Sequence, residues 1–281
     1  MKILSRGDRI SEGHYTVHSR FERVVNYNSN CKLLSFVSAA IGNGPVNIVI
    51  ESKLRALPAE ILILPDKFVF GIESIDISDI PVYDSKLKIL HSEQTILKEN
   101  LDALKQTLAS HASEYSLAFL FDEQRKLNFA TGFEKNLLET FENAIAQLRK
   151  GEIEPGIQKL SGLGQGLTPA GDDFIVGILL ALNLTDAFSG NEKSRELQMR
   201  IKSMAQTKNL ISQSSIVHAA DGYFAEIVKI FAQSFCNKRF SENDALILQL
   251  LNVGESSGAD MLSGFLFTFV SDKFHGLQVK I

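Results

Sequence analysis

The chain has 281 residues, of which 44% are hydrophobic and 22% charged, a composition typical of a globular protein with an ample core. A formal net charge of −4, with no basic cluster among aromatic residues, gives no electrostatic case for nucleic-acid binding. The sequence lacks a signal peptide and an apolar run of membrane-spanning length, and its two cysteines show no metal or redox spacing. These features predict a cytoplasmic protein without a membrane partner.

The first 90 residues are predicted to form a β-rich domain. Short apolar or alternating segments are separated by turn-forming Gly, Asn and Pro residues. These segments are 24–28, 32–41, 46–50, 60–65 and 67–77. Several short strands at close spacing predict a small barrel or sandwich.

The rest of the chain is predicted to be helical, which makes the fold class α+β. Apolar residues at helical spacing from Ile96 to Leu108 predict one helix over 94–112, in a bridging connector of residues 91–130. Residues 116–121 fit either a helix end or a strand. The all-helical domain is 131–281, with helices predicted at about 133–148, 169–184, 192–206, 212–236, 242–252 and 257–272. The tail, 273–281, is expected to be a closing strand or a frayed end.

A glycine loop precedes the most apolar of these helices, in the stretch SGLGQGLTPAGDDFIVGILLAL of residues 161–182. Thr168 and Pro169 are a strong helix start, in which the threonine hydroxyl can cap free amides. A helix N-terminus favours an anion, so Gly162, Gly164, Gly166 and Thr168 are predicted to bind a small oxyanion. The loop matches neither a P-loop nor a dinucleotide-binding fingerprint. A plain connection with a good helix cap is the alternative.

A second stretch, VGESSGADMLSGFL at residues 253–266, shares the pattern G-x-D-x-x-x-G-x-L with Gly171–Leu179. Residues four apart lie on one helix face, so the two helices are predicted to cross beside their glycines. That crossing would place Asp173 and Asp260 at the same end, with Ser257 and Gly258 adding ligand contacts. Chance similarity between two helices rich in small residues is the alternative.

Three carboxylates, those of Asp172, Asp173 and Asp260, are the candidate catalytic groups. Together they repel an anion unless a cation lies between them or one of them is protonated. Asp173 and Asp260 are therefore candidate magnesium ligands, or groups that orient an amide nitrogen. No other cofactor is predicted.

Two histidines are further candidates for the site. His18 precedes Ser19 and two arginines, which favours either a polar patch for an anion or a surface strand with ordinary charges. His218 and Asp221 lie three apart on a predicted helix, as a base and its orienting group, as two metal ligands, or as a solvent-facing pair.

Four segments together resemble the AllH family: GLGQGLTPAGDDFIVG, VGESSGADMLSGFL, LISQSSIVHAADGYFAE and VHSRFERVVNY. That family supplies a subunit of the oxamate carbamoyltransferase system of allantoin degradation, a route of purine catabolism. The resemblance implies a carbamoyltransferase subunit that acts with two larger partners in carbamoyl transfer between oxamate and phosphate. It also implies little activity in the isolated chain until the companion subunits are added.

Two functions remain open at this point. In the first, the chain is an enzyme subunit that binds phosphate, carbamoyl phosphate or an oxamate-like ligand at the glycine loop. In the second, it is a noncatalytic assembly subunit whose partners hold the active site.

Overall fold

The computed structural model describes residues 2–51, 54–89, 93–189 and 194–271, in two compact units. The first unit comprises Met1–Lys86 and Tyr223–Lys229, and the second comprises Leu87–Gly222 and Ile230–Ile281. The first is β-rich and the second helical, so the predicted α+β class is confirmed. The tail for which a closing strand or a frayed end is predicted, 273–281, lies outside the described residues.

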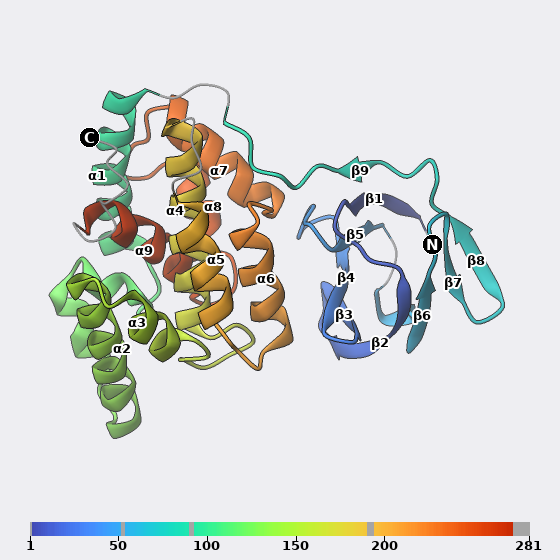
Figure 1. Ribbon diagram of the computed structural model, residues 1–281, viewed down its shortest axis with the longest axis horizontal. Coiled ribbons are helices and arrows are strands. Elements are labelled where there is room, and N and C mark those ends of the chain that lie inside the picture. Colours follow the sequence, from blue (N-terminus) through green and yellow to red (C-terminus); the bar gives the residue numbers. More distant parts are fainter. Residues whose placement is uncertain (1, 52–53, 90–92, 190–193, 272–281) are drawn as a thin grey trace. The chain divides into compact units, whose positions relative to one another are not determined.

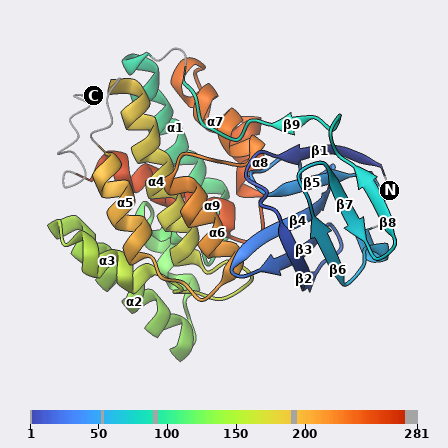
Figure 2. The same cartoon turned by 45° about the vertical axis from the view of Figure 1, so that its right-hand side comes forward.

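The β-rich unit is one curled sheet, a half-barrel (Figures 1 and 2). Its strands in the described residues are β1 (Ile3–Gly7), β2 (Gly13–Arg20), β3 (Val24–Ser29), β4 (Lys32–Ser38), β5 (Asn47–Ile50), β6 (Glu60–Ile63), β7 (Lys67–Phe70), β8 (Glu73–Asp76) and β9 (Val82–Tyr83). They follow the order β8-β7-β6-β2-β3-β4-β5-β1-β9. The β4–β5 and β1–β9 pairs are parallel and the other neighbours are antiparallel.

Aromatic residues pack in the core of this unit. Tyr15, Tyr27, Phe36 and Phe68 are fully buried. The ring of Phe36 meets that of Tyr27 at 5.7 Å and that of Phe68 at 6.2 Å between centroids, both edge to face. Such pairs add about 0.5–1.5 kcal/mol each to the burial of their area.

A short segment from late in the sequence belongs to this unit. Phe224 donates its N–H to the carbonyl of Ser85 (3.0 Å), and Glu226 donates its N–H to that of Asn43 (3.0 Å). The single helix predicted over 212–236 is therefore wrong: α6 (Leu210–Ala220) and α7 (Glu226–Asn237) are separate helices. Gly222, at φ +77°, takes the left-handed conformation that ends α6.

The helical unit contains the remaining elements of the described chain. They are α1 (Gln94–His111), η2 (Leu117–Leu120), η3 (Glu123–Asn128), α2 (Gly132–Lys150), α3 (Ile153–Leu160), α4 (Ala170–Ser189), α5 (Arg195–Met204), α8 (Ala245–Leu251) and α9 (Ser257–Val270), with α6 and most of α7. The ambiguous segment 116–121 is a 3-10 turn, η2. Helix α1 is part of this unit, since Asn100 donates to the carbonyls of Phe235 (2.9 Å) and Lys238 (2.7 Å).

Helices α4 and α9 form the centre of the helical unit. Every residue of α9 from Gly258 to Phe269 is buried. The ring of Phe265 lies 5.1 Å from both Phe235 and Phe269, so an aromatic cluster holds α9 in place. Within the described ranges, none of the helices combines the length and the apolar character that a membrane crossing requires.

Candidate functional site

The glycine loop between α3 and α4 needs its glycines. The φ values are +72° at Gly162, +120° at Gly164 and +96° at Gly166. Residues with a Cβ atom rarely adopt this region of backbone conformation. A Cβ on Gly164 would also lie 2.7 Å from the backbone nitrogen of Ala170. The start of the loop is fixed by Asp172, whose Oδ1 accepts the N–H of Gly162 at 2.7 Å.

The starts of α4 and α9 touch each other. Thr168 Oγ1 lies 2.7 Å from Ser257 Oγ and donates to Asp173 Oδ2 at 2.9 Å. The predicted meeting of the two helix starts is therefore confirmed. The predicted capping role of Thr168 is wrong, because the first helical carbonyl is that of Pro169 and the threonine hydroxyl turns to the carboxylate instead.

The two helices cross at their glycines, as the repeated pattern predicts. A Cβ on Gly177 would lie 1.9 Å from the carbonyl oxygen of Met261, and one on Gly264 would lie 2.0 Å from that of Phe174. Met261 and Phe174 each follow the aspartate of their own motif. The contact is thus reciprocal, a local pseudo-twofold arrangement in which α4 and α9 run in the same direction from adjoining starts.

The likeness extends backwards into a repeated helix–loop–helix unit. In α3–loop–α4, Leu163 donates its N–H to Leu160 (2.9 Å), and Gly171 donates its N–H to Leu163 (2.8 Å). In α8–loop–α9, the N–H of Val253 donates to the carbonyl of Leu250 (2.9 Å), and the N–H of Gly258 donates to the carbonyl of Val253 (3.0 Å). The glycine of each copy also packs on the carbonyl of that same leucine. A Cβ on Gly171 would lie 2.0 Å from the carbonyl oxygen of Leu160, and one on Gly258 would lie 1.8 Å from that of Leu250.

The two copies differ in the length of the loop. The segment from Leu163 to Gly171 has three residues more than the segment from Val253 to Gly258. In the described structure, the backbone N–H groups of residues 164–168 have no hydrogen-bond acceptor. The longer loop therefore presents free donors beside the helix start, whereas the N–H groups of Gly162 and Gly258 are already bonded within the protein.

The three carboxyl groups are buried to different degrees. Asp172 and Asp260 are fully buried, and Asp173 is partly exposed beside Thr168 and Ser257. Burial raises the pKa of Asp260 to about 7, although the Leu117 N–H, which donates to Oδ1 at 2.7 Å, lowers it in part. Burial and then the neighbouring Asp260 raise the pKa of Asp173 well above its usual range.

The pKa of Asp172 is also raised by burial, and Gly162 and the nearby Thr207 and Ser212 hydroxyls offset part of this rise. The two hydroxyls do not form a well-aligned bond, and Oδ2 of Asp172 and of Asp260 both lack a hydrogen-bond partner. The charge of Asp260 disfavours ionisation of Asp173, so the ionisation of one acid opposes that of the other.

Asn209 joins the loop to a third helix. Its Oδ1 accepts the N–H groups of Ile211 (3.0 Å) and Ser212 (3.1 Å), so Asn209 caps α6. Its Nδ2 donates to the carbonyl of Leu167 at 2.7 Å, a link that the sequence does not reveal.

These two roles of Asn209 can be separated by substitution. Asn209→Asp keeps the cap but loses the donor, so we expect faster amide exchange in 164–168 with the free energy of unfolding almost unchanged. Asn209→Ala loses both roles and should lower the free energy of unfolding by about 1 kcal/mol. Hydrogen exchange and urea unfolding measure the two effects. Identical behaviour of the two variants would show that the bond to Leu167 does not hold the loop.

The other predicted residues contact different partners. His18 is an exposed residue of β2, 3.1 Å from Ser19 Oγ. His218 Nδ1 lies 2.7 Å from the carbonyl of Ser214, while Asp221 pairs with Arg195 (3.0 Å) and Lys202 (2.6 Å). In the part of the chain that the structure describes, no group of three or more His, Cys, Asp or Glu side chains could hold a metal ion. Magnesium binding by Asp173 and Asp260 stays a prediction.

The fold and the site define an α+β protein whose helical unit repeats a helix–loop–helix and gathers two helix starts, a glycine loop and carboxyl groups. The family model for AllH, described as oxamate carbamoyltransferase subunit AllH, matches residues 160–269. The matched segment runs from the end of α3 into α9 and so contains both helix starts. This match supports the assignment to the AllH family that the motifs indicate.

The match supports a subunit of the oxamate carbamoyltransferase system, and the name of the family, which describes a subunit, implies companion subunits. No solved structure matches the chain.

Proposed function

We propose that the glycine loop and the starts of α4 and α9 bind the carbamoyl-bearing substrate of the carbamoyltransferase complex. The observation that carries this proposal is the extra length of the first loop. The second copy of the helix–loop–helix makes the same packing contacts with three residues fewer. Packing alone therefore does not require the full length of the first loop, and the free N–H groups of residues 164–168 point to a ligand with an acceptor oxygen.

The carboxyl groups restrict the kind of ligand. A bare oxyanion is repelled by ionised aspartates, whereas an amide nitrogen can donate to them. A carbamoyl group or oxamate offers both an oxygen for the loop and an NH₂ group for a carboxylate. Asp173 is suited to the NH₂ group because it is the partly exposed member of the three acids, steadied by Thr168 and close to Ser257.

The remaining acids have positioning roles in this proposal. Asp172 holds the beginning of the loop through Gly162, and Asp260 holds η2 through the N–H of Leu117. Burial keeps both away from the substrate. By raising the pKa of Asp173, Asp260 also helps to place a shared proton at the site.

Calorimetric titration with oxamate, carbamoyl phosphate and phosphate tests this function, on the chain alone and with its companion subunits. Asp173→Asn is expected to weaken oxamate binding about tenfold, because it can place an NH₂ donor where the carboxyl group offers an acceptor to the NH₂ group of the ligand. Thr168→Val should also weaken it. Thr140→Val is the matched control, since this exposed hydroxyl bonds only to the carbonyl of Asn136 in its own helix (2.8 Å). Equal affinity in Asp173→Asn and the native protein would contradict the proposal.

A noncatalytic assembly subunit is the second candidate, and one observation favours it. Gly177 and Gly264 are explained by backbone contact between α4 and α9 without any ligand. If complexes that contain Asp173→Asn or Thr168→Val keep full carbamoyl transfer, the assembly function is the better account.

A further inference from the structure

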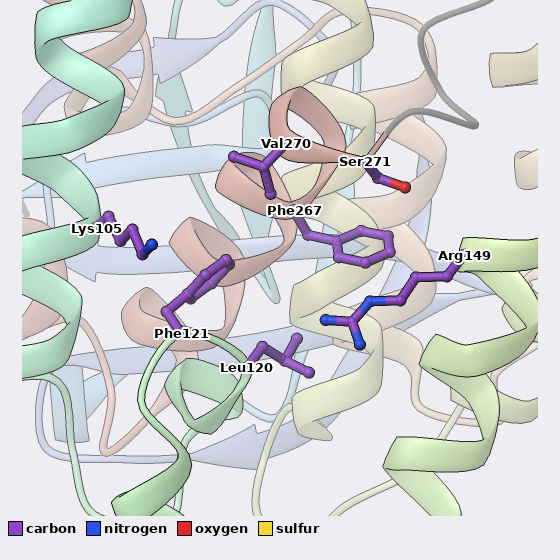
Figure 3. A pocket seen from close by; sticks show the side chains of 7 residues that line it. All are labelled: Lys105, Leu120, Phe121, Arg149, Phe267, Val270 and Ser271. Atoms are coloured by element: carbon purple, nitrogen blue, oxygen red, sulfur yellow. The ribbon is translucent and has the colours of Figure 1, made fainter.

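A hollow lies at the C-terminal end of α9. It has a volume of about 480 Å³ and is lined by Lys105, Leu120, Phe121, Arg149, Phe267, Val270 and Ser271 (Figure 3). Its size lies within the range of pockets that hold small molecules. Helix α9 rises about 1.5 Å per residue, so its residues that line this hollow are about 15–20 Å from Ser257 along the helix, and the hollow is separate from the glycine-loop site.

Two cations face this hollow from opposite walls. Figure 3 shows Lys105 reaching in from α1 and Arg149 from the last turn of α2. Neither has an ion-pair partner within the described residues, and the described lining contains no acidic side chain. The C-terminal ends of α9 and α2 each supply about half a negative charge, against two full positive ones. A positive surplus of roughly one charge therefore remains.

The surface between the two cations is apolar. Leu120 and Phe121 come from η2 and its end, and Phe267 and Val270 come from α9. In Figure 3, the rings of Phe121 and Phe267 lie between Lys105 and Arg149. An apolar surface adds no binding free energy for a fully hydrated inorganic ion. It does stabilise a bound organic molecule with a flat apolar part, because binding removes apolar surface from water.

We infer that this hollow is a binding site for a small organic dianion with a flat apolar body. Arg149 would hold one anionic group in a two-pronged contact, and Lys105 would hold the other as a point charge. The apolar body would lie on the two phenylalanines. The site is independent of the substrate site proposed above, so either one can fail without the other.

Isothermal titration with isophthalate, a rigid aromatic dicarboxylate, tests this site in the full chain. The native protein should show saturable binding at millimolar concentration or below. Lys105→Gln and Arg149→Gln should each weaken that binding about tenfold or more, because each removes a charged hydrogen-bond donor. Lys150→Gln is the matched control: this exposed lysine follows Arg149 in α2 but does not line the hollow. All three residues are exposed, so we expect the variants to fold like the native protein, and thermal melting verifies this.

Two further ligands sharpen the test. Neutral isophthalamide has the same shape without charge and should not bind measurably, while inorganic phosphate should bind more weakly than isophthalate because it has no apolar body. The inference is overturned by an absence of saturable isophthalate binding, by equal affinity of the native protein and both glutamine variants, or by phosphate binding as tightly as isophthalate.

Discussion

Replacing Gly177 by alanine is expected to lower the free energy of unfolding by about 3 kcal/mol or more, as overpacking of a rigid interface does. The new Cβ would lie 1.9 Å from the carbonyl oxygen of Met261, which is backbone and cannot rotate away. The helices must then separate along the most buried contact of the unit. Gly264→Ala should cost a similar amount, since its Cβ meets the carbonyl of Phe174 at 2.0 Å. Urea unfolding of the isolated chain measures both.

Gly132→Ala is the matched control for these variants. Gly132 is also helical, at the start of α2, but nothing lies within 4 Å of its Cβ position. This substitution should be neutral or stabilise the protein by up to about 1 kcal/mol. Because Gly177 and Gly264 share one interface, the double variant should lose less than the two single losses combined. A loss below about 0.5 kcal/mol in Gly177→Ala would contradict the crossing of α4 and α9 described above.

Asp260→Asn is expected to remove a large part of the pH dependence of stability. The pKa of Asp260 rises from 3.8 in the unfolded chain to about 7 in the fold, so the folded state binds the extra proton between these values. The contribution of this proton to the free energy of unfolding is complete below pH 4, and it is lost as the pH rises through 7. The whole loss is on the order of 4 kcal/mol for a shift of this size. Asparagine stays neutral and keeps an oxygen for the N–H of Leu117.

The free energy of unfolding should therefore increase in Asp260→Asn relative to the native protein between pH 5 and pH 8. Urea unfolding at a series of pH values gives this difference directly. Asp102→Asn, at an exposed position of α1, is the control and should follow the native curve because that side chain stays in water. Parallel curves for the native protein and Asp260→Asn would contradict the buried, proton-holding state of Asp260.

Much of the architecture follows from local patterns in the sequence. The β-rich half, the helix α1 and the meeting of α4 with α9 are all predicted, because alternation, helical spacing and the repeated glycines record which faces are buried. The pattern of Gly177 and Gly264 is especially informative, since only glycine permits backbones to approach so closely.

The features that the sequence does not predict have physical reasons too. The break between α6 and α7 depends on Gly222 and on pairing of Phe224 with Ser85, a contact far away in sequence. The bond from Leu117 to Asp260 is made by a backbone group, which no side-chain pattern reveals. Lys105 and Arg149 each resemble ordinary exposed helix residues until the fold places them across one hollow.

The proposed substrate site is tested most directly by hydrogen exchange of the backbone amides of residues 164–168, with and without oxamate, in the protein with its companion subunits. These amides have no acceptor in the described structure, so they should exchange rapidly without ligand and become protected when oxamate binds. Protection confined to 164–168 and to the starts of α4 and α9 is the predicted result. Unchanged exchange of these amides at a saturating oxamate concentration would contradict the site.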